Sequence, residues 1–221
     1  MSNLKKEWYR YLIEILVVIL GIMGAFTLES WRELRKEHSV RQELYRDFIQ
    51  ELATDMEDIQ GNAEFNKRYL KSYERASEII LNDSKRKLMD SLGIISMGLM
   101  EFSDFKKNGS AYEMLSSNGK LNLINNTTIL NQLQEIAIKY NYINRIESNQ
   151  ETLLFDVVPQ VAKMISFKPF KVMQPEVIYG YEMNNIFQIY IKLGQEKDGL
   201  YKEAIAMLRD LMSAMENELT D

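Results

Sequence analysis

The sequence predicts an all-α protein in which an N-terminal transmembrane helix continues into a long amphipathic helix, packed in an antiparallel helical bundle. An apolar run from Leu12 to Leu28, broken only by Glu14, predicts the membrane helix. Beyond it, apolar residues recur every three or four positions, which is helical spacing. Only three prolines and ten glycines occur among 221 residues, so long helices are permitted. No fixed-period repeat is present, which disfavours a solenoid.

The apolar run is long enough to serve as a membrane anchor. At a rise of about 1.5 Å per residue, a helix of roughly 17–20 residues crosses the hydrocarbon core of a bilayer. A cleavable signal peptide is disfavoured, because the run exceeds a typical signal core and Met23 precedes the small pair Gly24-Ala25. We expect a basic tail over 1–10, an anchor over 11–28 and a single helical soluble domain over 29–221.

Charge on the two flanks of the anchor bears on its orientation. Both flanks are basic, with Lys5, Lys6 and Arg10 before the run and Arg32, Arg35, Lys36 and Arg41 after it. The count is close to even, but a short basic tail favours a cytoplasmic N-terminus. The sequence therefore predicts a single-pass protein of the bacterial inner membrane, with its soluble domain in the periplasm.

Five residues in or beside the anchor are candidates for contact with lipid or with a partner helix. Gly21, Gly24 and Ala25 form a small-residue face on which two helices can approach closely. Trp31 is placed as an interfacial aromatic residue. Glu14 has two interpretations: a partner-binding or ion-linked carboxylate, or a group near the headgroups beside Arg10, one turn earlier.

The helices of the soluble domain follow from the apolar period and from capping residues. The stripe predicts one helix from about Trp8 to Gln60, ended by Gly61-Asn62, with 29–60 continuous with the anchor. Further helices are expected over 63–81 and 85–100. Ser110 and Glu113 match a capping box for a short helix that ends near Asn118-Gly119.

The second half of the chain contains three more predicted helices. Asn125-Asn126-Thr127 caps a long helix that Pro159 should kink or end. Residues 166–177 should be irregular or extended, with room for a short strand pair. Two closing helices are expected over 181–193 and 197–219, divided by Gly194.

Composition narrows the classes of function. The net charge of -5 argues against nucleic acid as a partner, since phosphate binding requires a basic surface. The chain has no cysteine, so it has no disulfide, no thiolate metal site and no cysteine nucleophile. Phosphate-binding loops, nucleophile elbows and dinucleotide fingerprints are absent from the sequence.

Few residues suggest chemistry. His38 is the only histidine and is interpreted as a half-exposed packing residue rather than as a catalytic or metal-binding group. Glu51, Asp55 and Asp58 share a helix face, with Glu57 nearby. They are interpreted as a solvated face in preference to a Ca²⁺ or Mg²⁺ site. We predict no catalytic residue, no cofactor and no metal.

Two tyrosine-rich segments have both a packing and a recognition interpretation. They are 139–142, with Tyr140 and Tyr142, and 179–181, with Tyr179 and Tyr181. Tyrosine is favoured at interfaces. Tyrosines at such spacing more often lie at the edge of a core with the hydroxyl outward. The core interpretation is preferred.

Two stretches resemble a family of bacterial single-span membrane proteins of unknown activity. The first is Tyr11–Ile22, followed by Trp31, and the second is Ser110–Leu121, followed by Leu123-Ile124. The family has a basic tail, a Gly-Glu-Ile-type anchor and a helical domain with a Tyr-Glu-x-Leu-x-x-x-Gly segment. Leu12-Ile13 replaces the usual small residue before the glutamate. The resemblance implies the architecture and an envelope location, and supplies no catalytic residue.

The expected function is that of a non-enzymatic accessory, scaffold or interaction protein that is anchored to the membrane. The lipid bilayer is therefore one expected partner. A protein partner or a second copy in the membrane is also expected. One alternative is a ligand sensor or effector that passes a signal to a partner through the continuous helix. Another is a membrane-tethered enzyme of a type that the sequence does not reveal.

Overall fold

The computed structural model describes residues 2–105, 117 and 123–220, with side chains described from Leu16 onward. The chain divides into two compact units, Met1–Asp47 and Phe48–Asp221. The capping box at Ser110, its short helix and the stop at Gly119 lie outside the described residues. All further description of packing concerns the second unit, unless the first is named.

The elements confirm an all-α fold with one small strand pair. In chain order they are α1 (Ser2–Asn82), α2 (Met89–Met97), η1 (Gly98–Met100), α4 (Thr127–Met164), β1 (Ile165–Phe167), β2 (Phe170–Val172), α5 (Pro175–Ile178) and α6 (Tyr181–Thr220). The two strands pair antiparallel, with Ile165 opposite Val172. This pair lies in the segment where a short strand pair was predicted.

The predicted stop of the first helix at Gly61 is wrong, since α1 continues to Asn82. A glycine inside a helix costs about 1 kcal/mol relative to alanine. Packing on either side outweighs that cost, because Ile59 is fully buried and Asn66 is 6% exposed. The helices predicted over 8–60 and 63–81 are therefore parts of one element.

Two further predicted helix ends are also overridden by packing. Pro159 does not end α4, which runs five residues beyond it to Met164. The prolyl ring is exposed, while Val157 and Val161 on the opposite face are buried. Gly194 does not divide α6, because the helix is buried there against Leu70 of α1. The separate closing helices over 181–193 and 197–219 are one helix.

The start of α4 confirms the predicted cap at Asn126. Its side-chain oxygen accepts hydrogen bonds from the backbone N–H groups of Thr128 at 2.9 Å and Ile129 at 3.3 Å. The side-chain amide donates to Glu218 of α6 at 2.7 Å. One residue thus begins a helix and attaches it to the end of another.

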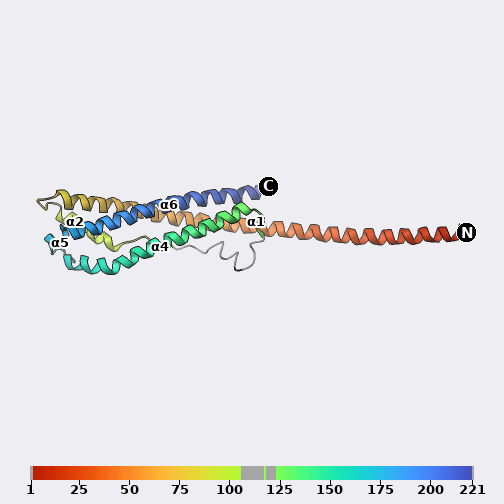
Figure 1. The fold of residues 1–221 in the computed structure, drawn as a ribbon, viewed down its shortest axis with the longest axis horizontal. Coiled ribbons are helices and arrows are strands. Elements are labelled where there is room, and N and C mark those ends of the chain that lie inside the picture. Colours follow the sequence, from red (N-terminus) through yellow and green to blue (C-terminus); the bar gives the residue numbers. More distant parts are fainter. Residues whose placement is uncertain (1, 106–116, 118–122, 221) are drawn as a thin grey trace. The chain divides into compact units, whose positions relative to one another are not determined.

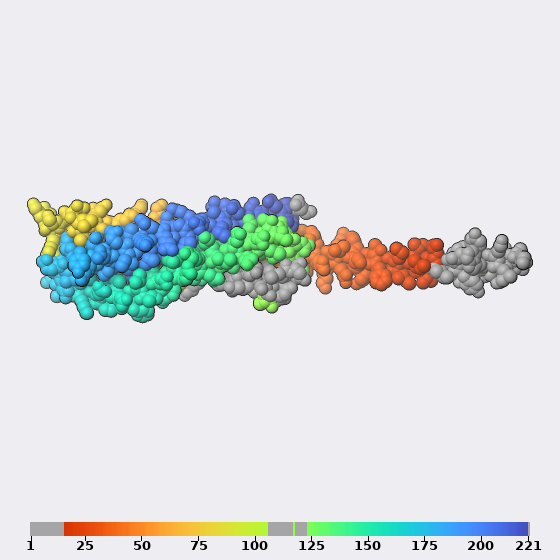
Figure 2. Space-filling view, in the orientation of Figure 1, coloured from red at the N-terminus to blue at the C-terminus, as the bar shows by residue number. Residues whose placement is uncertain are grey.

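Three long helices form the bundle, and their contacts fix their directions. Asn66 and Ser77 of α1 bond Gly194 and Asn184 of α6, so α1 and α6 run antiparallel. Asn126 at the start of α4 bonds Glu218, and Gln150 further along α4 bonds Lys197 earlier in α6, so these two helices also run antiparallel. Residues 48–82 of α1 therefore run in the same direction as α4, as Figure 1 shows. In Figure 2 the surfaces of α4 and α6 adjoin along their length.

The main core lies where α1, α4 and α6 meet the strand pair. An aromatic group at its centre joins α1 to α6: the Tyr73 ring lies 5.5 Å from that of Tyr190 and 6.0 Å from that of Phe187. The Tyr73 hydroxyl donates to the Gly98 carbonyl at 2.9 Å, which fastens η1 to α1. Burial of such aromatic side chains dominates the stability of a helical core.

The turn between α1 and α2 is held by one aspartate. The Asp83 carboxylate accepts hydrogen bonds from the N–H groups of Lys87 at 3.1 Å and Leu88 at 2.7 Å. The Tyr179 hydroxyl donates to it at 2.8 Å. Arg86 has a φ of 53° in this turn and forms a bidentate ion pair with Glu176 of α5. The turn is thereby docked onto α5.

Candidate binding groove and buried polar cluster

The predicted contact residues of the first unit are exposed wherever they are described. Ala25 is exposed, and a Cβ added at Gly21 or Gly24 would meet no atom within 4 Å. Trp31 is 50% exposed, and the Arg35 guanidinium lies 4.0 Å from its ring centroid. The side chain of Glu14 lies outside the described residues.

The apolar run is exposed around the whole circumference of the helix. Five consecutive side chains, Leu16 to Leu20, are each 50–60% exposed, and five positions cover more than one turn. Within the part of the chain that the structure describes, no helix is long and apolar enough to cross a membrane. Four residues of the run, at 12–15, lie before the first described side chain.

The other candidates from the sequence do not assemble into a catalytic or metal site. His38 is exposed rather than half-buried. Asp55 is 1% exposed, so the solvated-face interpretation is wrong for this residue. Its charge and that of Glu51 raise the pKa of Tyr140, adding to the larger effect of burial. Among the described residues, no group of three His, Asp or Glu side chains is placed to hold a metal.

The tyrosines divide between the core and the surface. Tyr140 is buried, and its ring meets that of Phe105 edge-on at 5.0 Å. Tyr179 donates to Asp83 in the turn described above. Tyr142 is 40% exposed beneath Arg145, and Tyr181 is 75% exposed. Of these four residues, only Tyr142 and Tyr181 are exposed.

A buried polar cluster, which the sequence did not reveal, lies between α4, α6 and the segment after η1. Glu147 of α4 is 3% exposed. Its carboxylate accepts a hydrogen bond from the N–H of Phe105 at 2.9 Å and another from the hydroxyl of Tyr201. Ser103 Oγ is hydrogen-bonded to the same Tyr201 hydroxyl at 2.8 Å. Glu147 therefore fastens residues 103–105 to both long helices.

Lys197 brings a second charge into this cluster. It is 2% exposed, and its ammonium donates to Gln150 Oε1 at 2.7 Å. Burial lowers the pKa of Lys197 to about 8, against a smaller opposing effect of the Glu147 charge. Burial likewise raises the pKa of Glu147, although the bonds from Tyr201 and Phe105 oppose the shift. Desolvation outweighs mutual attraction for both groups.

The sequence contains a signal for this cluster. Glu147 and Gln150 follow the buried Ile143 by four and seven positions, so they lie on the apolar stripe of α4. Lys197 precedes the buried Tyr201 by four positions on α6. A charged residue at a core position of a helix requires a buried partner. Two such residues on different helices point to a shared polar cluster.

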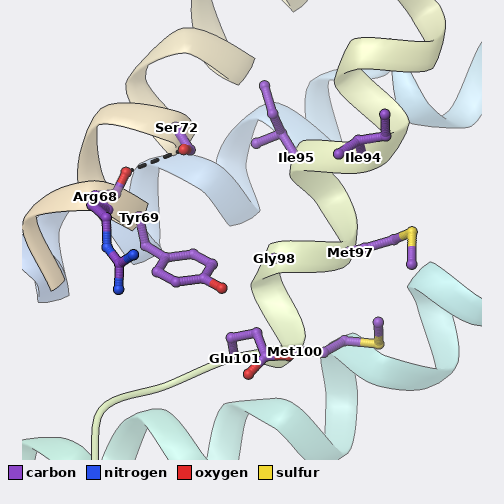
Figure 3. A pocket seen from close by; sticks show the side chains of 9 residues that line it. All are labelled: Arg68, Tyr69, Ser72, Ile94, Ile95, Met97, Gly98, Met100 and Glu101. Atoms are coloured by element: carbon purple, nitrogen blue, oxygen red, sulfur yellow. Dashed lines mark hydrogen bonds between the residues drawn. The ribbon is translucent and has the colours of Figure 1, made fainter. Parts of the chain in front are cut away.

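A groove runs between α1 and the α2–η1 segment (Figure 3). Its volume is about 530 Å³, within the range of ligand sites, and it is lined by Arg68, Tyr69, Ser72, Ile94, Ile95, Met97, Gly98, Met100 and Glu101. The Tyr69 ring points across the groove towards Gly98 in Figure 3. A Cβ at Gly98 would lie 3.0 Å from Tyr69 Cε1, so this close approach depends on the absence of a side chain.

Charges of both signs border the groove. Arg68 lies on the α1 wall and Glu101 follows η1 on the other wall, as Figure 3 shows. Burial raises the pKa of Tyr69, the Glu101 charge adds to this effect, and the Arg68 charge opposes it. The Tyr69 hydroxyl therefore lies in the field of both charges. The apolar wall and the mixed charges suit an amphipathic ligand better than a covalent reaction.

Comparison with known proteins adds no relative. No family model matches the chain, and neither the curated proteins nor the solved structures yield a significant match.

Proposed function

We propose that this chain is a membrane-anchored, non-enzymatic accessory, scaffold or interaction protein of the bacterial cell envelope. Residues 11–28 insert into the inner membrane as a single-pass anchor, and the domain lies in the periplasm. The observation that carries this proposal is the exposure of the apolar side chains 16–28 on all faces of α1. A helix that is apolar all round requires an apolar environment on every side, and a bilayer supplies one.

The anchor confines the helical domain to the membrane plane. Confinement raises the effective concentration of the domain towards membrane-bound partners, so weak contacts between them suffice. The open face at Gly21, Gly24 and Ala25 offers a close approach for another membrane helix. Trp31, half-exposed and stacked under Arg35, fits the headgroup region. The resemblance to single-span envelope proteins supports the same location.

Carbonate extraction of membranes from a bacterium that expresses the full chain tests the anchor. We expect the wild-type chain to stay in the membrane pellet. Ile19→Arg places a charge near the middle of the anchor, at a cost of about 3 kcal/mol on insertion scales, and should move a large fraction into the supernatant. Leu81→Arg is the matched control, because Leu81 is 70% exposed on the same helix but lies outside the anchor. Extraction of the wild-type chain by carbonate would contradict the proposal.

Cysteine labelling tests the orientation separately. The chain has no cysteine, so Glu216→Cys, at an exposed site of α6, introduces a single thiol. A membrane-impermeant maleimide should label this thiol in intact spheroplasts. Labelling only after lysis would place the domain in the cytoplasm and would leave the anchor itself in place.

A ligand sensor is the second candidate, and the groove favours it. One wall of the groove belongs to α1, the helix that also contains the apolar run. A ligand that changed the spacing of α1 and α2 would act directly on that helix. Any output would pass to a partner protein.

A further inference from the structure

The groove in Figure 3 is one of two hollows along the same pair of segments. The second hollow has a volume of about 240 Å³ and is lined on α1 by Arg75, Glu78, Ile79 and Asn82, and beyond the end of α1 by Asp83 and Leu88. From Arg68 to Asn82 the α1 wall is about 21 Å long, at a rise of about 1.5 Å per residue. An occupant that covers both hollows is therefore elongated.

The wall opposite α1 is apolar and adaptable. Ile94 is 62% exposed on α2, with Ile95 beside it. Met97 and Met100 continue this wall towards Glu101. Methionine side chains adjust their shape to different apolar partners. Ile95, Met97 and Met100 are half-buried against the main core, so they offer the groove only part of their side chains, and Ile94 is the exposed member of this apolar wall.

The α1 rim is basic beside the first hollow, whereas beside the second hollow Arg75 forms an ion pair with Glu78 at 3.1 Å. Lys67, Arg68 and Lys71 lie within two helical turns, and they line a further hollow beside the groove together with Glu64. Among the described residues, none of these three basic side chains has an ion-pair partner within 4.0 Å. Glu101 on the opposite wall likewise forms no ion pair with another described residue. The two rims thus present unpaired charges of opposite sign across an apolar floor.

We propose that the α1–α2 groove binds an amphipathic helix of about 14 residues from a partner protein, with acidic residues directed towards Lys67, Arg68 and Lys71. The inference rests on the proposed function, because it names the chemistry of the partner that an interaction protein would hold. The apolar stripe of the partner lies on Ile94, Ile95, Met97 and Met100. Binding of a helix in a groove uses apolar anchors at positions i, i+3, i+4 and i+7.

Charge selects this occupant over an anionic lipid. A lipid head group carries its charge at one end, so it would neutralise the α1 rim and leave Glu101 facing an anion or an acyl chain. A helix with an acidic flank and a basic flank complements both rims together. Complementary charges across an interface fix orientation and exclude partners of the wrong sign.

Selection from a phage-displayed library of randomised 14-residue helical peptides tests the inference. The target is the full chain in nanodiscs. We expect the selected peptides to share an apolar stripe with an acidic flank. Their affinity, measured by fluorescence anisotropy, should fall at least tenfold for Ile94→Glu and for Arg68→Glu with Lys71→Glu. Binding should also weaken as salt is raised.

Matched variants outside the groove separate loss of groove binding from a general effect of the introduced charge on peptide affinity. Ile189→Glu places the same charge at an isoleucine of α6 that is 49% exposed, and Arg209→Glu reverses an exposed arginine of α6. Both should leave the affinity unchanged. Selection of basic peptides, absence of any binder, or binding that survives the groove variants would overturn the inference.

A second copy of the chain is the competing occupant. Ile94→Cys introduces the only thiol, so oxidation of this variant in nanodiscs would give a disulfide dimer if two grooves faced each other. We expect no such dimer, and its appearance would overturn the assignment to a partner helix. Carbonate extraction tests the anchor independently, so failure of the groove inference is distinguishable from failure of the proposed function.

Discussion

Removal of the buried ammonium of Lys197 should abolish the rise in the free energy of unfolding that this group contributes above pH 8. Lys197→Met keeps a long side chain of similar volume and removes the charge. The pKa of Lys197 is about 8 in the folded chain, because burial disfavours the ammonium, and 10.5 is its ordinary value. Between these two values the unfolded chain binds more protons than the folded chain. Stability from this group therefore rises as the pH increases through that window.

The size of the effect follows from the two pKa values. The fall in the pKa of Lys197 from 10.5 to about 8 corresponds to a gain of about 3 kcal/mol in the free energy of unfolding once the pH lies above both values. From pH 8 to pH 9.5 the gain is about 1.5 kcal/mol, since part of the proton release occurs on either side of this range. Burial raises the pKa of Tyr201 in the same cluster, which opposes the gain above its ordinary value of 10.0. Measurements should therefore stop near pH 9.5.

Urea unfolding of the full chain in mild detergent, followed by circular dichroism at 222 nm, measures the effect. The free energy of unfolding of the wild type minus that of Lys197→Met should increase by about 1.5 kcal/mol from pH 8 to pH 9.5. Loss of the hydrogen bond to Gln150 lowers the stability of the variant at every pH and cancels in this difference. Lys192→Met, at an exposed position of the same helix, should give a difference that stays constant with pH. A constant difference for Lys197→Met would show that the ammonium is not held in an apolar environment, and the account of the cluster would fail.

Three further changes, with Gly199→Ala as a control, probe the packing and the caps by the same unfolding assay. Gly93→Ala should destabilise the chain by about 1–3 kcal/mol, because its Cβ would lie 2.8 Å from Val172 Cγ2; Gly199→Ala, with no atom within 4 Å, should instead stabilise it by about 0.5–1 kcal/mol. Equal effects of the two would refute the close approach of α2 to β2. Asn126→Ala should cost about 1 kcal/mol through loss of the α4 cap, and an unchanged midpoint would argue against that cap. The hydrogen bond from Leu88 lowers the pKa of Asp83, so its stabilising effect is present at neutral pH and is lost as the pH falls through the folded pKa. Asp83→Asn should therefore be less stable than the wild type at pH 7 and equal to it in acid, and a gap that persists in acid would contradict this assignment.

Local signals predicted the elements of this fold better than their ends. The Asn126 cap and the strand pair near residue 166 were predictable, because capping and prolines act within a few residues. Gly61, Pro159 and Gly194 were expected to divide or end helices, and none does. Each penalty is local, whereas the apolar contacts that outweigh it come from other segments of the chain, as with Leu70 of α1 beside Gly194 of α6. A single sequence does not reveal such pairings.

The sites were less predictable than the fold. The helical period puts Glu147 and Lys197 in line with buried residues of α4 and α6, but it does not say which helices pack together, so the polar cluster emerged only from the structure. The groove could not be predicted from the sequence for the same reason, since its walls come from α1 and from residues 94–101. Asp55 was assigned to the solvent because acidic residues usually face water. The apolar run, by contrast, was evident from the order of residues 12–28 alone, and its membrane role remains a prediction.

The bond from the Asn66 amide to the Gly194 carbonyl, at 2.8 Å, limits how α1 can transmit a signal. Asn66 is 6% exposed, so an axial displacement of α1 by one turn, about 5.4 Å, would leave a donor stranded in an apolar interior. Piston-like sliding is therefore costly. Rotation of α1 about its own axis would likewise carry the Asn66 amide away from its acceptor, whereas tilting of α1 about this point preserves the bond. If the domain communicates with the membrane, tilting is the motion that its interior allows.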